Sequence, residues 1–366
     1  MLPLRRSIRP SAPPLLLALL ALVLFAGAAW ASVGDQLPEF KDCVQVCKAE
    51  NCREGHQTPI RTSTTAPVLS HRPNSNNLPF FPRASQLTNN HLPSALHRRL
   101  LLWDCPAECD YACQHIITRQ RVASSSRVVQ FHGKWPFYRF LGAQEPLSVL
   151  FSLGNLWAHY NGLAKIRARV PARYPLRPFY VVLAYVGIAS WVASAVFHVR
   201  DFRATEQLDY FAAGANVLYG TYYAPVRVFR LDRPTPTRRS ALRAWTLLCA
   251  LMYAAHVAYL KGVRWDYQYN MTANIAVGAV QNVLWTWFSV QKYRQSRRLW
   301  TAWPGLVVAW VMLAMSMELL DFPPWLGLID AHSLWHLFTI APTILFYNFL
   351  VMDATADIAS TERLKA

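Results

Sequence analysis

The chain has 366 residues, of which 53% are hydrophobic and only 16% are charged. About a quarter of the residues of an ordinary soluble domain are charged, so this composition argues against a soluble protein. The formal net charge is +17, but the basic residues cluster in short segments between apolar runs. This pattern is typical of the cytoplasmic loops of membrane proteins and argues against nucleic-acid binding.

Residues 1–31 are predicted to form a signal peptide. Three arginines lie within residues 5–9, an apolar run follows at Leu15–Phe25, and Ala29–Ala31 has the small-x-small pattern of a cleavage site. The apolar run is short for a membrane span, although an uncleaved anchor is the alternative interpretation. In both cases the segment that follows is expected in the lumen of the secretory pathway.

Residues 32–142 form the predicted luminal head, which contains an even number of cysteines. An even count in an oxidising compartment predicts disulfides, and a zinc site is the less favoured alternative. The spacings C-x3-C-x4-C and C-x3-C-x3-C place thiols on successive turns of two short helices, which bridges between the clusters would join. Sequence alone does not fix the pairing. Residues 55–97 are rich in Pro, Ser, Thr and Asn and predict a disordered insertion. The clusters are Cys43, Cys47 and Cys52, then Cys105, Cys109 and Cys113.

Residues 143–350 are predicted to be a bundle of seven transmembrane helices, and residues 351–366 a cytosolic tail. Each apolar run has about the twenty residues that a helix needs to cross the hydrocarbon core. The fold class is therefore an all-α membrane protein with a small disulfide-rich N-terminal head. The predicted spans are Pro146–Ala164, Pro178–His198, Gln207–Val226, Leu242–Leu260, Met271–Val290, Leu299–Leu319 and Ala331–Phe349.

The connecting loops predict the orientation of the bundle. Basic residues are concentrated in 165–177, 227–239 and 292–298, which are the first, third and fifth loops. The loops between them carry only Arg200, Arg203, Lys261 and Arg264. Because cytoplasmic loops are enriched in Lys and Arg, this asymmetry agrees with a luminal head and a cytosolic C-terminus.

Polar residues within the predicted spans are the candidates for function, because ionisable groups are costly in the membrane. Residues four apart share one face of a helix, as do Ser194 with His198 and His332 with His336. The second span ends at the lumen, where the third and seventh begin, so these residues and Asp209 are all expected near the luminal face. The pattern predicts one site built from three spans.

Three neutral imidazoles with one open position are the ligand set of a catalytic zinc ion, which lowers the pKa of a bound water to about 7. We therefore expect His198, His332 and His336 to bind zinc. Asp209 is the candidate general base, or a partner of a histidine N–H. Ser194 is the candidate hydrogen-bond donor to a developing oxyanion.

Other polar residues in the spans have simpler interpretations. His256 is alone in its span and is expected to pack through a hydrogen bond. Glu145 and Asn155 are interpreted as structural hydrogen-bonding residues, with lining of the cavity as the alternative. The segment 332–336 lacks the glutamate of H-E-x-x-H, which argues against a metalloprotease of that type.

Further segments are specific enough to compare with known families. They are Trp103-Asp104-Cys105-Pro106-Ala107-Glu108-Cys109-Asp110-Tyr111-Ala112-Cys113, Gln130-Phe131-His132-Gly133-Lys134-Trp135-Pro136-Phe137, Gln144-Glu145-Pro146, Asn155, Phe197-His198-Val199-Arg200-Asp201 and Thr205-Glu206-Gln207-Leu208-Asp209-Tyr210. The serine, histidine and aspartate pattern resembles the membrane hydrolase superfamily that includes alkaline ceramidases and the adiponectin and progestin receptors. Within it, the chain most resembles the Per1-like family of GPI-anchor lipid remodelling enzymes.

The resemblance implies an activity that the residue spacing alone does not. It implies removal of the sn-2 acyl chain from the phosphatidylinositol of GPI-anchored proteins, which would be the partners of this chain. It also implies residence in the membrane of the endoplasmic reticulum, with the Golgi as the alternative. The insertion between the cysteine clusters departs from the compact head expected in the family.

Three other functions remain open at this point. A ceramidase-like amidase would use the same metal site on a sphingolipid, and the head motifs argue against it. A receptor, or a non-catalytic escort for GPI-anchored proteins, would keep the same ligands. The short predicted tail disfavours signalling. A transporter is disfavoured because no inverted repeat or matching pair of broken spans is visible.

Overall fold

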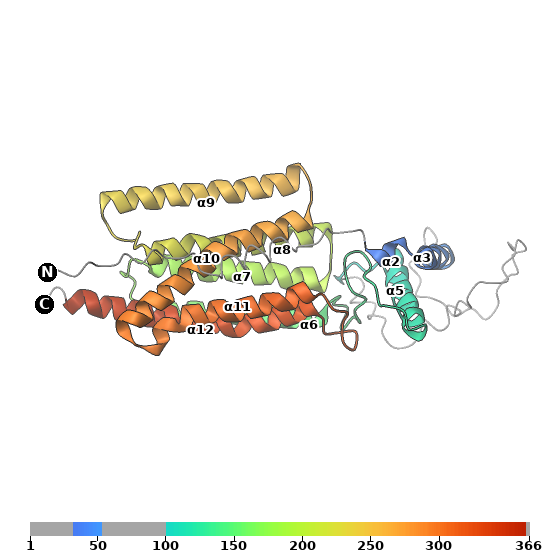
Figure 1. Cartoon of the computed structure of the whole chain (residues 1–366). Coiled ribbons are helices and arrows are strands. Elements are labelled where there is room, and N and C mark those ends of the chain that lie inside the picture. The colour runs from blue at the N-terminus through green and yellow to red at the C-terminus, as the bar shows by residue number, and fades with distance from the viewer. Residues whose placement is uncertain (1–31, 53–99, 364–366) are drawn as a thin grey trace, which may run out of the picture.

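The computed structural model of the chain describes residues 32–52 and 100–363. The predicted signal peptide, the predicted insertion at 55–97 and the last three residues lie outside the described residues. Within the described residues all regular structure is helical, apart from isolated β-bridges in turns. A small head lies at one end of a bundle of long helices, and the C-terminus lies near the opposite end (Figure 1).

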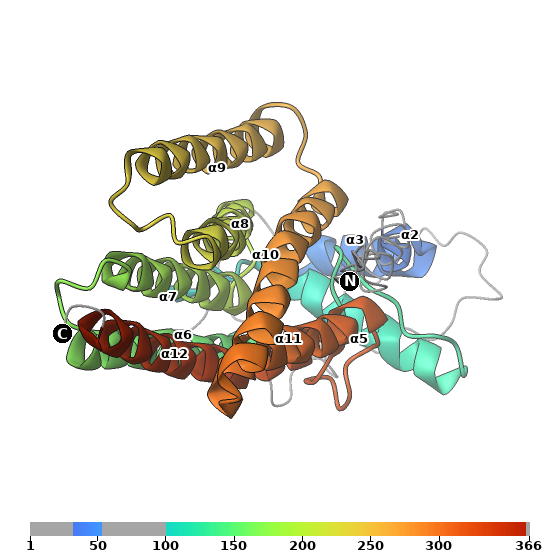
Figure 2. The same cartoon turned by 60° about the vertical axis from the view of Figure 1, so that its left-hand side comes forward.

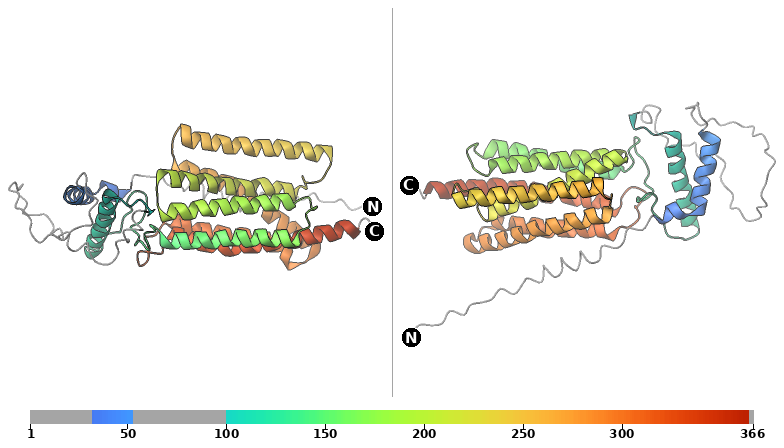
Figure 3. Two further views of the ribbon diagram at one scale, coloured as in Figure 1. Left: turned by 180° about the vertical axis from the view of Figure 1, so that it is seen from behind. Right: turned by 90° about the horizontal axis from the view of Figure 1, so that it is seen from above.

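The head is built on two helices that lie side by side across the end of the bundle (Figures 1 and 3). They are α3 (Pro38–Asn51) and α5 (Cys105–Ala123), with the single turn α2 (Val33–Gln36) before them. A proline lies in the first turn of each long helix, and the Asp104 side chain caps α5 by accepting a hydrogen bond from the Ala107 amide.

Three disulfides join α3 to α5, which confirms the prediction of bridges between the two clusters. Cysteines four apart lie on one face of each helix, and Cys52 follows the last residue of α3, so the bridges form a ladder between antiparallel helices. Three of the sulfurs lie close enough together for a metal, but all six are bonded to one another in pairs. The six cysteines of the head are therefore interpreted as three disulfides rather than as a zinc site. The pairs are Cys43–Cys113, Cys47–Cys109 and Cys52–Cys105.

Each predicted span lies in its own long helical segment of the bundle. Two of the segments differ from the prediction. The sixth run begins in the 3₁₀ turn η2 (Leu299–Ala302), and the seventh helix continues without a break to Arg363, which lies within the predicted tail. The helices are α6 (Pro146–Arg169), α7 (Arg177–Val199), α8 (Arg203–Val228), α9 (Pro236–Gly262), α10 (Tyr267–Ser296), α11 (Trp303–Leu320) and α12 (Ala331–Arg363).

Four segments are long and apolar enough to cross a membrane: α7, α9, η2 with α11, and α12. The chain is therefore a multi-pass membrane protein. Helix α6 packs along both α7 and α12, whereas α9 lies at the outer edge of the bundle, next to α8 (Figure 2). The polar side chains of the site come from the closely packed helices, together with α8 and α11.

Buried ion pairs connect α8 to α12 at the end of the bundle away from the head. Arg227 donates two hydrogen bonds of 2.6 Å to the carboxylate of Asp353, and both side chains are almost completely buried. One turn farther on, Arg230 donates to both oxygens of Asp357 at 2.8 and 2.9 Å. These carboxylates neutralise the two guanidinium groups, so each of the four side chains has an oppositely charged partner.

Candidate metal centre

Three imidazoles converge at the end of the bundle that faces the head. His198 lies on the last turn of α7, and His332 and His336 lie on the first two turns of α12. The Nε2 atom of His332 is 3.3 Å from Nε2 of His198 and 3.0 Å from Nε2 of His336. All three Nε2 atoms lie within 4.8 Å of one another. The structure therefore brings together the three residues that the sequence predicted as metal ligands.

The opposite nitrogen of two of these rings is held by a carboxylate. Nδ1 of His198 is 2.9 Å from Oε2 of Glu145, and Nδ1 of His332 is 2.8 Å from Oε2 of Glu318. An ionised carboxylate only accepts hydrogen bonds, so each Nδ1–H is the donor and each Nε2 lone pair faces the centre. Lone pairs at 3 Å repel one another unless a cation lies between them. This arrangement fits a metal ion, since metal-binding histidines are typically oriented in this way.

The third ring is held by a chain of hydroxyl groups. Nδ1 of His336 is 2.9 Å from Oγ of Ser152, and Oγ of Ser152 is 3.1 Å from Oγ of Ser194. Ser152 and Ser194 are both buried. If the Nδ1–H of His336 donates to Ser152, then Ser152 donates to Ser194, and the hydroxyl proton of Ser194 is left for another acceptor.

Asp209 lies on α8 at the same end of the bundle. Its carboxylate interacts electrostatically with His198 and His332. Within the described residues, no hydrogen bond or ion pair joins this carboxylate to another side chain. It is therefore available to a ligand of the site, unlike Glu145 and Glu318, whose oxygens are already bonded to imidazoles.

The backbone at the start of α6 places Glu145 against His198. The amide of Glu145 donates to the carbonyl of His198 at 3.0 Å, and the Glu145 side chain is almost completely buried. Asn155, farther along α6, donates to the backbone carbonyl of His336 at 2.7 Å. The prediction that both residues make structural hydrogen bonds agrees with these contacts. The structure adds that Glu145 bonds directly to a candidate ligand.

Lys134 is held over Glu145 by tight turns that lie between the head and the bundle. The segment Phe131–Lys134 closes with two backbone hydrogen bonds, and its central residues, His132 and Gly133, have φ values of 50° and 80°. Positive φ at both positions is typical of a type I′ turn and explains the glycine. The turn presents the Lys134 ammonium to the carboxylates of Glu145 and Asp201. Burial opposes the charge on Lys134, but the two carboxylates outweigh it and raise its pKa.

Glu318 and Ser152 were missed by the sequence analysis. Glu318 is a carboxylate near the end of an otherwise apolar helix, a position that itself points to a function. Ser152 gives no such signal, because serine is common in helices that pack closely in membranes. His256, by contrast, lies outside the cluster and stacks on Tyr269, with ring centroids 5.4 Å apart.

The access to the centre is on the side of His332. Its side chain is 36% exposed, whereas His198 and His336 are almost completely buried. The ring of His336 also packs edge-on against Trp191, with centroids 5.2 Å apart. A ligand therefore reaches the three nitrogens past His332 rather than through the interior of the bundle.

Comparison with known proteins identifies the family of the chain. The model of the Per1-like family matches residues 95–354. The chain is 38% identical to the protein PER1 homolog of Schizosaccharomyces pombe, over 92% of each chain. It is 37% identical to the GPI-specific phospholipase A2-like PGAP3 of Homo sapiens, over 93% of this chain and 96% of the relative. It is 36% identical to protein PER1 of Saccharomyces cerevisiae, over 88% of this chain and 92% of the relative. The chain is a member of the Per1-like family.

Proposed function

We propose that this chain remodels the lipid of GPI-anchored proteins by hydrolysing the sn-2 acyl ester of their phosphatidylinositol moiety, with zinc held by His198, His332 and His336. The observation that carries the proposal is the convergence of three Nε2 atoms whose opposite nitrogens are all held by hydrogen bonds. The similarity to proteins named GPI-specific phospholipase A2-like supports the substrate.

The residues around the three histidines have separate roles in ester hydrolysis. Zinc, when bound, supplies a Lewis acid and lowers the pKa of water at the site. Asp209, whose carboxylate is free of other partners, accepts the proton of the attacking water. Ser194 donates its remaining hydroxyl proton to the oxygen of the sn-2 carbonyl, where negative charge develops. Glu145, Glu318 and Ser152 fix the ring orientations.

The same proposal places the site in the membrane. All seven helices from α6 to α12 cross the bilayer, with the head and the three histidines on the luminal side and the end carrying Arg227 in the cytosol. The basic loops 165–177, 227–239 and 292–298 support this orientation. A GPI anchor lies in the luminal leaflet, and its glycerol esters lie at the boundary of the hydrocarbon. We place the chain in the endoplasmic reticulum membrane.

The test is mass spectrometry of the phosphatidylinositol released from GPI-anchored proteins. Cells that lack their own enzyme would express the wild type, His336→Ala or His256→Ala at matched levels. The wild type and His256→Ala, a control that changes a membrane histidine outside the cluster, are expected to yield the lyso or remodelled lipid. His336→Ala is expected to leave the sn-2 chain in place.

Two results would overturn parts of the proposal. Normal turnover by His336→Ala would remove the metal site from the mechanism. Failure of a folded and correctly located wild type would remove the substrate, and ceramide would then be assayed with the same purified protein.

A further inference from the structure

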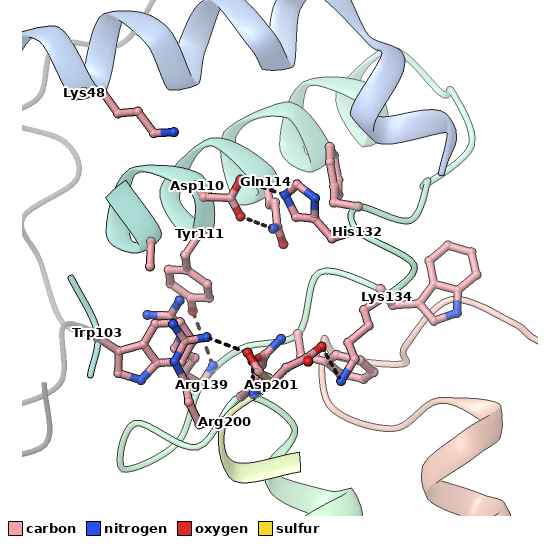
Figure 4. A pocket seen from close by; sticks show the side chains of 15 residues that line it. Lys48, Trp103, Asp110, Tyr111, Gln114, His132, Lys134, Arg139, Arg200 and Asp201 are labelled. Carbon is pink, nitrogen blue, oxygen red and sulfur yellow. Dashed lines mark hydrogen bonds and ion pairs between the residues drawn. The ribbon is translucent and has the colours of Figure 1, made fainter. Parts of the chain in front are cut away.

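A cavity of about 440 Å³ lies where the head meets the bundle (Figure 4). Its wall comes from α3 and α5 in the head, the junction loop 131–144, and the residues that follow α7. Lys134 belongs to this wall and also bonds to Glu145, which in turn bonds to His198. The cavity is therefore separated from the candidate metal centre by two side chains.

The charge of the cavity wall is positive. Two aspartates, Asp110 and Asp201, are outnumbered by the cationic side chains. The ammonium of Lys134 already forms ion pairs with Glu145 and Asp201, whereas the ammonium of Lys48 has no partner among the described residues. The excess of positive charge favours an anionic ligand. The cationic side chains are Lys48, Lys134, Arg139 and Arg200.

Arg139 is the most unusual group in this wall, because its side chain is only 4% exposed. One nitrogen donates to Glu108 at 2.9 Å, but the buried Nε–H has no partner among the described residues. Burial lowers the pKa of Arg139 to about 10, which still leaves it charged at neutral pH. A buried guanidinium donor without an acceptor is costly, so Arg139 is not explained by its structural contacts alone.

An indole ring fixes the two arginines of the wall. The guanidinium carbon of Arg139 is 3.2 Å from the ring centroid of Trp103, and that of Arg200 is 3.6 Å from the same centroid. The indole nitrogen of Trp103 donates to the carbonyl of Gly142 at 2.9 Å, which holds the ring in place. The ring holds both guanidinium groups in place, and each keeps N–H groups beyond those that donate to Glu108, or to the carbonyls of Leu101 and Asp201, so a phosphate can bind at the edge of either one.

The other side of the cavity offers groups suited to hydroxyls rather than to phosphate. Asp110 accepts hydrogen bonds from Gln114 at 2.7 Å and from His132 at 2.9 Å, and all three line the cavity (Figure 4). Carboxylate and amide oxygens accept hydrogen bonds from the hydroxyls of a sugar or a cyclitol. The cavity thus combines a cationic wall with a wall that can bind a polyol.

We propose that this cavity binds the headgroup of the substrate, a phosphodiester linked to a polyhydroxylated ring. Arg139 and Arg200 bind the phosphate, Lys48 adds positive charge at the rim, and the Asp110 side binds the hydroxyls. This inference rests on the proposed function, because it assigns the polar part of the same lipid to the head while the ester enters the metal centre. It also gives the head a role in selecting the lipid.

The first experiment measures binding rather than hydrolysis, with the full chain in lipid nanodiscs and soluble probes in a calorimeter. Glycerophosphoinositol is expected to bind, whereas glycerophosphocholine, which lacks the polyol, binds at least about tenfold more weakly. Inorganic phosphate separates the two parts of the site. If inorganic phosphate binds as tightly as glycerophosphoinositol, the assignment of a polyol-binding wall is overturned. If neither probe binds, the whole proposal is overturned.

Variants in the wall assign the phosphate contact. Arg139→Gln is expected to weaken binding of glycerophosphoinositol roughly tenfold, since it removes a charged donor. Lys48→Glu reverses an exposed, unpartnered charge without disturbing the fold and is expected to weaken binding several-fold. Arg119→Glu, at an exposed arginine on α5 outside the cavity, is the control with the same change of charge. Equal affinity of Lys48→Glu and Arg119→Glu would contradict the assignment of Lys48, and unchanged binding by a folded Arg139→Gln protein would contradict the phosphate site.

A second readout separates this inference from the proposed function. With the intact lipid, Lys48→Glu is expected to raise KM several-fold relative to the Arg119 control, and its effect on hydrolysis of diacylglycerol, which has no headgroup, is expected to be smaller. If the wild type hydrolyses neither lipid, the proposed function fails while the binding result stands. If Lys48→Glu impairs both lipids equally, the cavity does not act on the headgroup.

Discussion

The two ends of the helix bundle both bury ionisable side chains, but they use them differently. At the far end, Arg227 and Arg230 face Asp353 and Asp357, and each of these four side chains has an oppositely charged partner. At the head-facing end, Glu145 and Glu318 bond the outer nitrogens of two histidine rings, and the inner nitrogens of all three rings face one another. Complete pairing is what a structural cluster needs, whereas convergent unpaired atoms indicate a binding site.

The largest expected effect is on the head-facing end. Asp209→Asn removes the proposed base but keeps the shape of the side chain, so turnover is expected to fall by about 10²–10⁴-fold. The zinc content, measured by elemental analysis of the purified protein, should stay at the wild-type level. Full activity in this variant would leave Asp209 with a structural role only and make the two ends more alike than we propose.

At the far end, the expected loss is in stability rather than in activity. Arg227→Met or Asp353→Leu alone leaves one buried charge without its partner, which typically costs about 3–5 kcal/mol. The double variant is expected to recover most of the wild-type Tm, because neither charge remains. Thermal unfolding in detergent measures all three proteins. Activity per folded molecule should be unchanged in each, and a specific loss of activity would contradict a structural role.

A smaller effect is expected from the carboxylate that orients His332. Glu318→Gln keeps the shape but removes the charge that favours an Nδ1–H donor, so zinc affinity or activity is expected to fall about 10–100-fold. Competition with a chelator measures the affinity. Glu206→Gln is the control, since this carboxylate on α8 accepts from the indole of Trp265 instead of from a histidine. Equal zinc affinity of the two variants would argue against the role of Glu318.

The smallest effect is expected in the head, where charges are exposed to solvent. The hydrogen bond to Asp110 raises the pKa of His132, with further contributions from Asp110 and Asp35 that outweigh burial. The stabilisation is thus fully present below the unfolded pKa of about 6.5 and is lost as the pH rises through the raised folded value. Amide exchange in residues 128–136, corrected for intrinsic rates, should speed up between pH 5.5 and 8.5. His132→Gln should abolish that difference, and a slowing with pH would contradict the assignment.

The sequence predicted the histidine cluster because a helix places residues four apart on one face and the apolar runs fix the depth of each residue. The structure therefore places the rings of His198, His332 and His336 close together, as expected. Glu318 was missed because its partner, His332, lies on the next helix, and the rotation of α11 against α12 is set by side-chain packing. The cavity in the head was also invisible, since its walls come from segments that only the turns at 131–134 and 140–143 bring together.

The disulfide between Cys52 and Cys105 has a consequence for how far the sequence of the head can vary. It joins the two residues that flank the insertion and lie 53 positions apart in the sequence. The two other disulfides continue the same junction on the side away from the insertion. A proteolytic cut, a deletion or a new sequence within residues 55–97 leaves α3 and α5 covalently joined in the same register. The length of this segment can therefore vary while Trp103, which follows it, keeps its place in the cavity wall.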